Sequence, residues 1–298
     1  MIVFAALIVA IVVTFAFTRQ DTGFAVQKDL YRHANLREVD QVVMKSPSGE
    51  VDLKFVENRW RVNGSFPADR NLIEVLFATL QQVEAKRPVA RSMNDSIATH
   101  LRDNGVLVSL RDDDQPELEF FAGGNPARTL AYFVEKNGST PHVVVIPGYR
   151  VYVSGIFELP AIQWREKLIF DINWTNFRDL AAEFRNPQGN FVVELNKNTA
   201  VIKGVAEPDT ARLNTFLDDL LLLTVDQYVE TTSSLDSLAG TEPHASYAIT
   251  DIGGRTYRLR VYTLDNQFIG VIGDDVFAIL ARERIVPLLR PKEFFLKR

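Results

Sequence analysis

The chain starts with an uncharged apolar segment. Residues 1–18 read MIVFAALIVAIVVTFAFT, in which only Thr14 and Thr18 are polar, and the first charge is Arg19. As an α-helix this segment has a length of about 27 Å, close to the thickness of a bilayer's hydrocarbon core. A cleaved signal peptide usually has a basic start and a small-residue cleavage site, and neither is clear in this segment. The pattern favours an uncleaved membrane anchor at residues 1–18, followed by a linker at residues 19–35.

Short apolar or alternating segments follow the linker, and such segments predict strands. The first three, separated by turns, are residues 39–44, 51–56 and 60–62. A leucine-rich stripe with helical spacing comes next, from an N-cap at Asp69 through Val83 to a stop at Pro88. A short helix is expected at residues 97–101. The order predicts a three-stranded meander followed by two helices.

The rest of the chain continues this alternation. Further strand-like segments are residues 106–110, 118–121, 130–134 and 142–146, and later residues 247–250, 257–262 and 268–272. A second leucine-rich helix is predicted from Asp209 to residue 223. Antiparallel hairpins interrupted by a few helices do not suit a doubly wound parallel sheet. The predicted fold class is therefore α+β, with mostly antiparallel strands.

The chain also aligns with itself. Residues 46–64 (SPSGEVDLKFVENRWRVNG) match residues 186–204 (NPQGNFVVELNKNTAVIKG) at a constant offset of 140 residues. The helices that follow pair Leu72 with Leu213, at an offset of 141.

A third pair of segments aligns Gly148 with Gly273 and Phe170 with Phe295, at an offset of 125. Shortened loops in one copy of a duplicated domain explain a falling offset. The sequence therefore predicts two tandem α+β repeats, at residues 36–172 and 173–298.

The first repeat contains a recognisable set of motifs. ENRWRVNG at residues 57–64 is a strand–turn–strand segment with a tryptophan, and Pro-Ala-Asp at residues 67–69 precedes the leucine-rich helix. With the strand–turn–strand segments that follow, this arrangement resembles the bacterial Domain of Unknown Function 4340 family. The resemblance covers most of residues 36–170 and continues more weakly to Phe295, with Ala200 or Val201 in place of the tryptophan.

The resemblance carries expectations about function. Members of that family typically have an N-terminal membrane anchor and are often associated with genes for an ABC-type transporter and its gliding-motility-like auxiliary subunit. It implies an accessory protein rather than a catalyst, and it supplies no catalytic residues for this chain.

Composition narrows the function classes. The chain is 46% hydrophobic and 24% charged, which excludes a largely disordered chain or a polytopic membrane protein. Its formal net charge of -5 gives no overall basic field, so no nucleic-acid partner is expected. Because it has no cysteine, disulfides, zinc–thiolate sites, iron–sulfur clusters and thiol nucleophiles are excluded.

The sequence gives only weak evidence for a metal-binding or phosphate-binding site. The four histidines are His33, His100, His142 and His244. They lack the spacing of a local zinc site. The glycine pairs at residues 123–124 and 253–254 lie between strand-like segments and not before helices, so they are predicted to be turns rather than phosphate loops. Residues 112–114, three aspartates, are predicted to form a solvated hairpin tip rather than a cation site. Asp274 and Asp275 are predicted to begin a helix as capping charges.

Neither the serines nor the tryptophans provide a specific candidate for a catalytic or binding site. Gly-x-Ser-x-Gly is absent, so nucleophilic hydrolysis is not predicted. Trp60, Trp164 and Trp174 have basic neighbours that suit a stacking surface for a ligand or glycan, but core packing is the favoured interpretation. Trp164 and Trp174 are also hypothesised to pack the two halves together. The sequence therefore predicts no catalytic, metal-binding or cofactor-binding residues and no cofactor.

The prediction for function is a non-catalytic accessory or scaffold protein of the bacterial inner membrane. It is single-pass, with its C-terminal domain extracytoplasmic (periplasmic), and its expected partners are ABC-type transporter subunits. One alternative is a periplasmic module that binds or hydrolyses an envelope polysaccharide or peptide, and a third possibility is a purely structural spacer.

Overall fold

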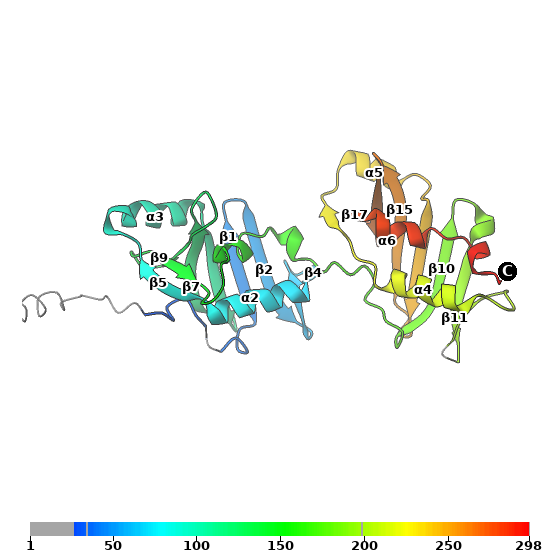
Figure 1. The fold of residues 1–298 in the computed structure, drawn as a ribbon, viewed down its shortest axis with the longest axis horizontal. Coiled ribbons are helices and arrows are strands. Elements are labelled where there is room, and N and C mark those ends of the chain that lie inside the picture. The colour runs from blue at the N-terminus through cyan, green and yellow to red at the C-terminus, as the bar shows by residue number, and fades with distance from the viewer. Residues whose placement is uncertain (1–26, 34, 198, 298) are drawn as a thin grey trace, which may run out of the picture. The chain divides into compact units, whose positions relative to one another are not determined.

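The structure of the chain is a computed structural model that describes residues 27–33, 35–197 and 199–297. Two compact units are present (Figure 1). Of the described residues, the first unit comprises residues 27–65 and 70–161, and the second comprises residues 66–69 and 162–297. The predicted anchor at residues 1–18 lies outside the described residues. Within the described part of the chain, no helix is long and apolar enough to cross a membrane.

The first sheet has nine strands in the order β4-β3-β2-β1-β6-β7-β8-β9-β5. From β3 to β5 all neighbours are antiparallel. The strands are β1 (Gln41–Ser46), β2 (Gly49–Val56), β3 (Arg59–Val62), β4 (Phe66–Pro67), β5 (Glu84–Pro88), β6 (Val106–Asp112), β7 (Gln115–Gly124), β8 (Ala131–Glu135) and β9 (His142–Val145). The helices are α2 (Arg70–Gln82), α3 (Arg91–Asn104), η1 (Val153–Ile156) and η2 (Ala161–Trp164).

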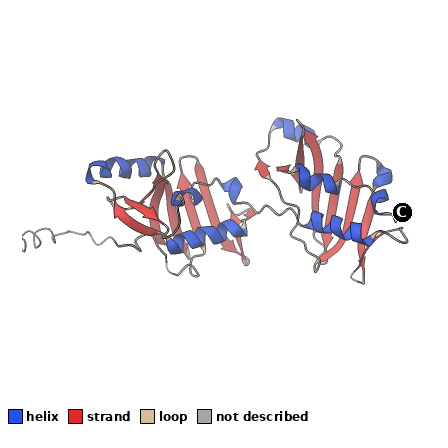
Figure 2. Ribbon diagram, viewed as in Figure 1, coloured by secondary structure: helices blue, strands red, loops and turns tan. Residues whose placement is uncertain are grey.

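Alternation along β1 gives this sheet one apolar face. Val42 pairs with Leu53 on β2 and with Leu110 on β6, and all three side chains are buried. Helix α2 lies along the sheet (Figure 2) and buries Ile73, Leu76, Thr79 and Leu80. Spacing of three and four residues puts these side chains on one face of the helix, which is why this segment folds as an amphipathic helix against strands.

The described end of the predicted linker is packed into this unit. Tyr31 is fully buried, and its ring meets the rings of Phe120 and Phe133 edge-on. Its hydroxyl donates to the Phe133 carbonyl at 3.0 Å, which satisfies a polar group inside an aromatic cluster.

The second sheet has eight strands in the order β12-β11-β10-β14-β15-β16-β17-β13, all antiparallel. The strands are β10 (Phe177–Phe184), β11 (Phe191–Asn196), β12 (Thr199–Ile202), β13 (Gln227–Val229), β14 (Ala245–Asp251), β15 (Thr256–Leu264), β16 (Gln267–Ile272) and β17 (Val276–Leu280). The helices are α4 (Thr210–Leu221), α5 (Ser233–Ala239), α6 (Arg282–Ile285), η3 (Pro187–Gly189), η4 (Val286–Leu288) and η5 (Lys292–Phe295). Two antiparallel sheets with a few helices confirm the predicted α+β class.

The two sheets share one strand order. Reading β3-β2-β1-β6-β7-β8-β9-β5 against β12-β11-β10-β14-β15-β16-β17-β13 matches every strand of the second sheet with one of the first. A hydrogen bond before α2 also matches one before α4. Asp69 N–H donates to the Trp164 carbonyl at 2.7 Å, and Asp209 N–H donates to the Phe295 carbonyl at 2.7 Å.

This order corrects two details of the sequence alignment. Buried positions on α2 and α4 match at an offset of 140, as in Ile73 with Leu213 and Leu80 with Leu220, so the predicted offset of 141 was wrong by one residue. The third pair was also wrong. Gly148 follows β9, whereas Gly273 precedes β17, so the two glycines occupy different places in the strand order.

Two local predictions were also wrong, and one predicted helix was too short. Residues 273–275 form a turn and lead into β17 rather than into a helix, because Val276–Leu280 pairs with β16 and β13. Helix α2 ends at Gln82, and residues up to Pro88 form edge strand β5. The short helix predicted at residues 97–101 is the fourteen-residue α3.

Candidate binding sites in the first unit

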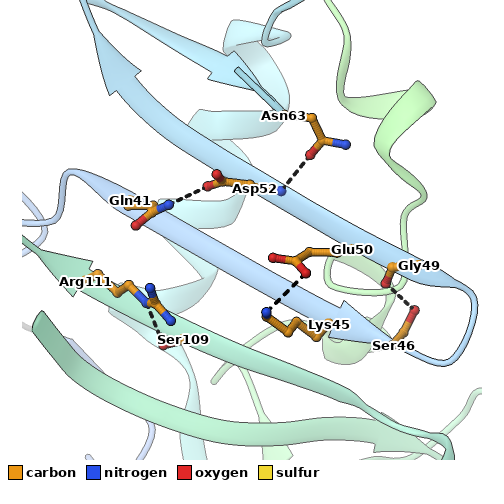
Figure 3. Close-up of polar contacts among 9 residues, drawn as sticks. All are labelled: Gln41, Lys45, Ser46, Gly49, Glu50, Asp52, Asn63, Ser109 and Arg111. Carbon is orange, nitrogen blue, oxygen red and sulfur yellow. Dashed lines mark hydrogen bonds and ion pairs between the residues drawn. The ribbon is translucent and has the colours of Figure 1, made fainter. Parts of the chain in front are cut away.

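One face of the first sheet carries a ladder of polar side chains from β1, β2 and β6 (Figure 3). Gln41 Nε2 donates to Asp52 Oδ1 at 2.7 Å, and the Asp52 backbone N–H donates to Asn63 Oδ1 at 2.9 Å. Lys45 Nζ lies 3.1 Å from Glu50 Oε2. These contacts follow from the antiparallel register, because Gln41, Lys45 and Asp52 lie on the face opposite to Val42 and Leu53; the buried Val43 lies between them on the polar face.

The ladder continues onto β7. The Ser109 hydroxyl donates to Glu119 Oε1 at 3.1 Å, and Lys136 Nζ donates to Glu119 Oε2 at 2.7 Å. Arg111 Nε donates to Ser109 Oγ at 3.4 Å. Burial on its own raises the pKa of Glu119, but these hydrogen bonds from Lys136 and Ser109 outweigh it, so the pKa lies below its ordinary value. The negative charge of Glu119 is stabilised by side chains of the same sheet, which favours a structural role for this face of the sheet.

A polar pocket of about 260 Å³ opens where the end of α3 meets the turn after β7. Its polar side chains are His100, Asn104, Asn125, Arg128, Tyr152 and Glu158. Glu158 is the central acceptor: the Tyr152 hydroxyl donates to Oε1 at 2.5 Å, and Arg128 pairs with Oε2 at 2.7 Å. Burial and the neighbouring Glu158 both raise the pKa of Tyr152, so this phenol stays protonated and acts as a donor.

Two glycines allow this pocket to close. A Cβ on Gly124 would overlap the Tyr152 ring, and one on Gly123 would lie 2.7 Å from Leu101 Cδ2. The Ser154 hydroxyl donates to the Gly123 carbonyl at 2.6 Å. The sequence marked this glycine pair as a turn, whereas the structure places it at the end of β7. Close packing of Tyr152 and Leu101 onto the strand is what requires glycine here.

Next to this pocket, and sharing Tyr152 with it, lies an apolar groove of about 540 Å³. One wall is α2 and the other is the segment from residue 146 to residue 159. The lining residues are Val75, Ala78, Thr79, Gln82, Ile146, Tyr149, Val151, Tyr152, Val153, Gly155, Ile156 and Leu159. Three of them are large hydrophobic side chains that water reaches: Val75 is 50% exposed, Tyr149 66% and Val151 54%.

A tight turn builds the outer wall of this groove. Pro147 and Gly148 occupy its central positions, Gly148 has a φ of 82°, and the Tyr149 N–H donates to the Ile146 carbonyl at 3.1 Å. Proline followed by a glycine with positive φ is the pattern of a type II turn. Sequence periodicity treated Ile146 as a strand end and missed the groove. The Pro-Gly pair followed by Tyr-Arg-Val was the signal for a projecting loop.

The aspartate cluster and the second glycine pair, which the sequence analysis considered as possible cation and phosphate sites, lie in hairpin turns. Asp113 and Asp114 have φ of 46° and 63° and form the β6–β7 hairpin tip, where Lys54 Nζ lies 3.1 Å from Asp114 Oδ1. Gly253 and Gly254 lie in the β14–β15 turn, as predicted.

The β14–β15 turn is held by a buried carboxylate. Asp251 accepts from the Arg255 N–H and from Arg255 Nε, each at 2.8 Å.

The four histidines do not come together at one site. His142 Nδ1 lies 2.9 Å from the Tyr31 hydroxyl, and His100 lies on α3. Among the described residues, no group of three or more histidine, aspartate or glutamate side chains is placed to hold a metal ion.

The three tryptophans have different environments. Trp60 packs against Phe55 and Phe77, and Trp164 is fully buried. Trp174 is 38% exposed, and its Nε1 donates to Asp218 Oδ1 on α4 at 2.6 Å. Trp164 therefore fits the favoured interpretation of core packing, and Trp174 is anchored by a single hydrogen bond to the helix.

Comparison with known proteins gives one result. The family model described as "Domain of unknown function (DUF4340)" matches residues 60–243, from β3 in the first sheet to the loop before β14 in the second. No curated protein and no solved structure matches the chain. Because the match spans more than half of the chain, the protein belongs to the DUF4340 family.

Proposed function

We propose that the protein is a non-catalytic accessory or scaffold subunit, anchored in the bacterial inner membrane by residues 1–18, with its two units on the periplasmic side. The apolar segment supports the anchor, since eighteen uncharged residues suit a single span. Membership of the DUF4340 family supports the association with an ABC-type transport complex through the resemblance already described.

The observation that carries the scaffold role is the shared strand order of the two units. Eight strands correspond in order, and the hydrogen bonds of Asp69 and Asp209 recur in equivalent places. This supports two tandem repeats derived from one duplicated unit, the first of the two ending near Trp164. Duplication provides two similar surfaces on one chain, which suits holding subunits of a complex together.

The test is to isolate the full-length protein from native membranes in a mild detergent and to identify the proteins that copurify. The expected result is recovery of an ATPase and a permease in fixed ratio to the protein. A matched control uses a chain in which charges interrupt the apolar segment, such as Val9→Lys with Val13→Lys. Failure of the unaltered chain to recover any transporter subunit would contradict the proposal.

A second candidate function rests on the polar pocket. Glu158, Tyr152, Arg128 and His100 gather donors and acceptors in one hollow, which suits a periplasmic module that binds an envelope polysaccharide or peptide. Hydrolysis by the usual glycosidase route needs two carboxylic acids, and the pocket lining holds one, Glu158. Binding therefore suits this pocket better than hydrolysis. Titration with muropeptides and envelope glycans, compared between the unaltered chain and Glu158→Gln, tests it.

A further inference from the structure

The apolar groove of the first unit leaves hydrophobic surface in water. Val75, Tyr149 and Val151 are each at least half exposed and line the same hollow. Contiguous exposed apolar surface on a soluble unit marks an interaction site, because its burial against another apolar surface is favourable.

The fold itself does not require this groove. At the offset of 140 residues that relates α2 to α4, the groove positions Val75, Ala78 and Thr79 correspond to Thr215, Asp218 and Asp219. In the second unit β17 ends at Leu280 and α6 begins at Arg282, so no equivalent of the projecting loop at residues 146–152 exists there. The apolar lining is thus particular to the first unit.

The start of the described chain is tied to the same end of the first unit. The Lys28 carbonyl accepts from the Ala85 N–H at 3.0 Å, and the His33 N–H donates to the Leu80 carbonyl at 3.1 Å. Leu80 lies on α2. Glu84, at the start of β5, pairs with Val145, the residue before the projecting loop at residues 146–152, which we call the groove loop. Ten residues separate position 18 from Lys28, so the covalent chain limits their separation to about 35 Å.

The elements around this end carry exposed basic side chains. They stand near the chain entry, on β5 and on the loop at residues 146–152: Lys28, Lys86, Arg87 and Arg150, with one exposed acid, Asp29, beside Lys28. Nearby Glu84 is already paired with Arg32 at 2.8 Å. Local positive charge on a chain of net charge -5 complements the anionic headgroups of a membrane surface. Tyrosine is also enriched at the membrane–water interface, where its amphipathic ring lies at the level of the headgroups.

We infer that the groove docks on the surface of the bilayer that holds residues 1–18, with Tyr149 and Val151 entering its interfacial layer. This inference rests on the proposed membrane anchor. Docking buries the exposed apolar side chains, brings the basic residues against headgroups and fixes the first unit relative to the membrane.

The cysteine-free chain allows a direct test. A nitroxide label on Val151→Cys, in the full-length protein reconstituted into vesicles containing phosphatidylglycerol, reports the collision rates of lipid-soluble oxygen and a water-soluble nickel chelate. The matched control is Leu222→Cys, an apolar position at the end of α4 that is 72% exposed. We expect the oxygen-to-nickel ratio at position 151 to exceed that at position 222 several-fold.

Two results would overturn the docking. Equal ratios at positions 151 and 222 mean that the loop stays in water. A label at position 151 that is shielded from both reagents, with spin–spin broadening that disappears on dilution with unlabelled protein, means that a second copy covers the groove instead. The variant Tyr149→Asp with Arg150→Glu supplies a further check, since both side chains are exposed and docking, not folding, is expected to fail.

Failure of the anchor is distinguished by alkaline carbonate extraction of the same vesicles. Protein that resists extraction while the label at position 151 stays in water contradicts docking and supports the anchor. Protein that is extracted, although the label was in lipid before extraction, contradicts the anchor and supports docking.

Discussion

The two units of this protein have one strand order but different surfaces. In the first unit α2 presents Val75 and Ala78 to an open groove, whereas in the second α4 presents Thr215 and Asp218 at the equivalent positions. Asp218 also accepts a hydrogen bond from Trp174. Conserving buried positions while changing exposed ones keeps a fold and alters its contacts, because stability depends on the core and recognition depends on the surface.

The largest expected effect tests whether Trp164, which follows the first sheet in the chain, and Phe295, which follows the second, occupy equivalent positions. Trp164 and Phe295 are both fully buried, and each offers its carbonyl to the aspartate before a long helix. Trp164→Ala and Phe295→Ala should each lower the free energy of unfolding by about 3–5 kcal/mol, because each removes a large buried ring. Urea denaturation of the full chain measures this.

The control for this pair is Trp164→Phe. Trp164 Nε1 is buried with no hydrogen-bond partner among the described residues, so phenylalanine loses volume but no hydrogen bond. Its cost should be well below that of alanine. A loss for Trp164→Ala under 1 kcal/mol, roughly that of an average substitution, would contradict the equivalence.

A smaller effect is expected at the start of α4. The Asp209 carboxylate accepts from the Arg212 N–H at 3.1 Å and so caps the helix, as its position in the sequence predicted. Asp209→Ala should cost about 1 kcal/mol, and Asp209→Asn, which keeps an acceptor at the cap, should cost little. Thermal unfolding followed by circular dichroism compares the two variants, and equal losses would argue against capping.

The stability of the first unit should also depend on pH through His142. The second unit has no equivalent histidine. Burial lowers the pKa of His142 below its ordinary value of 6.5. Below about pH 6.5 the unfolded chain therefore binds more protons than the folded chain, so stability is full above that pH and declines as the pH falls. His142→Gln should flatten this decline below about pH 6.5.

Denaturation midpoints at several pH values measure this slope. An unchanged slope in His142→Gln would contradict the prediction.

The smallest expected effect on stability comes from replacing groove residues on α2 with the residues found at the equivalent positions of α4. Val75→Thr with Ala78→Asp should change the unfolding free energy by no more than about 0.5 kcal/mol, because both positions are exposed. The same variant should lose the docking of the groove, which the label at position 151 reports. A large loss of stability would mean that the groove residues support the core.

Some features could be predicted from the sequence because they depend on local chemistry. The alternating segments that became β1, β2 and β3 carry their pattern in neighbouring residues, and Asp113 with Asp114 formed the hairpin tip as expected. The strand β5 was missed. It is a five-residue edge strand with Lys86 and Arg87 at its centre, and its strand conformation is fixed by pairing with β9.

The sequence by itself determined the α+β class, the leucine-rich helices α2 and α4 and the match of residues 46–64 with residues 186–204, because these are set by the period of apolar positions and by turn residues. Only the tertiary structure decided which later segments correspond and where the binding surfaces lie. Trp164 matches Phe295 through backbone hydrogen bonds to residues far away in the chain. Tyr149 and Val151 line a groove because a type II turn places them beside α2, a contact between segments about seventy residues apart that no local pattern encodes.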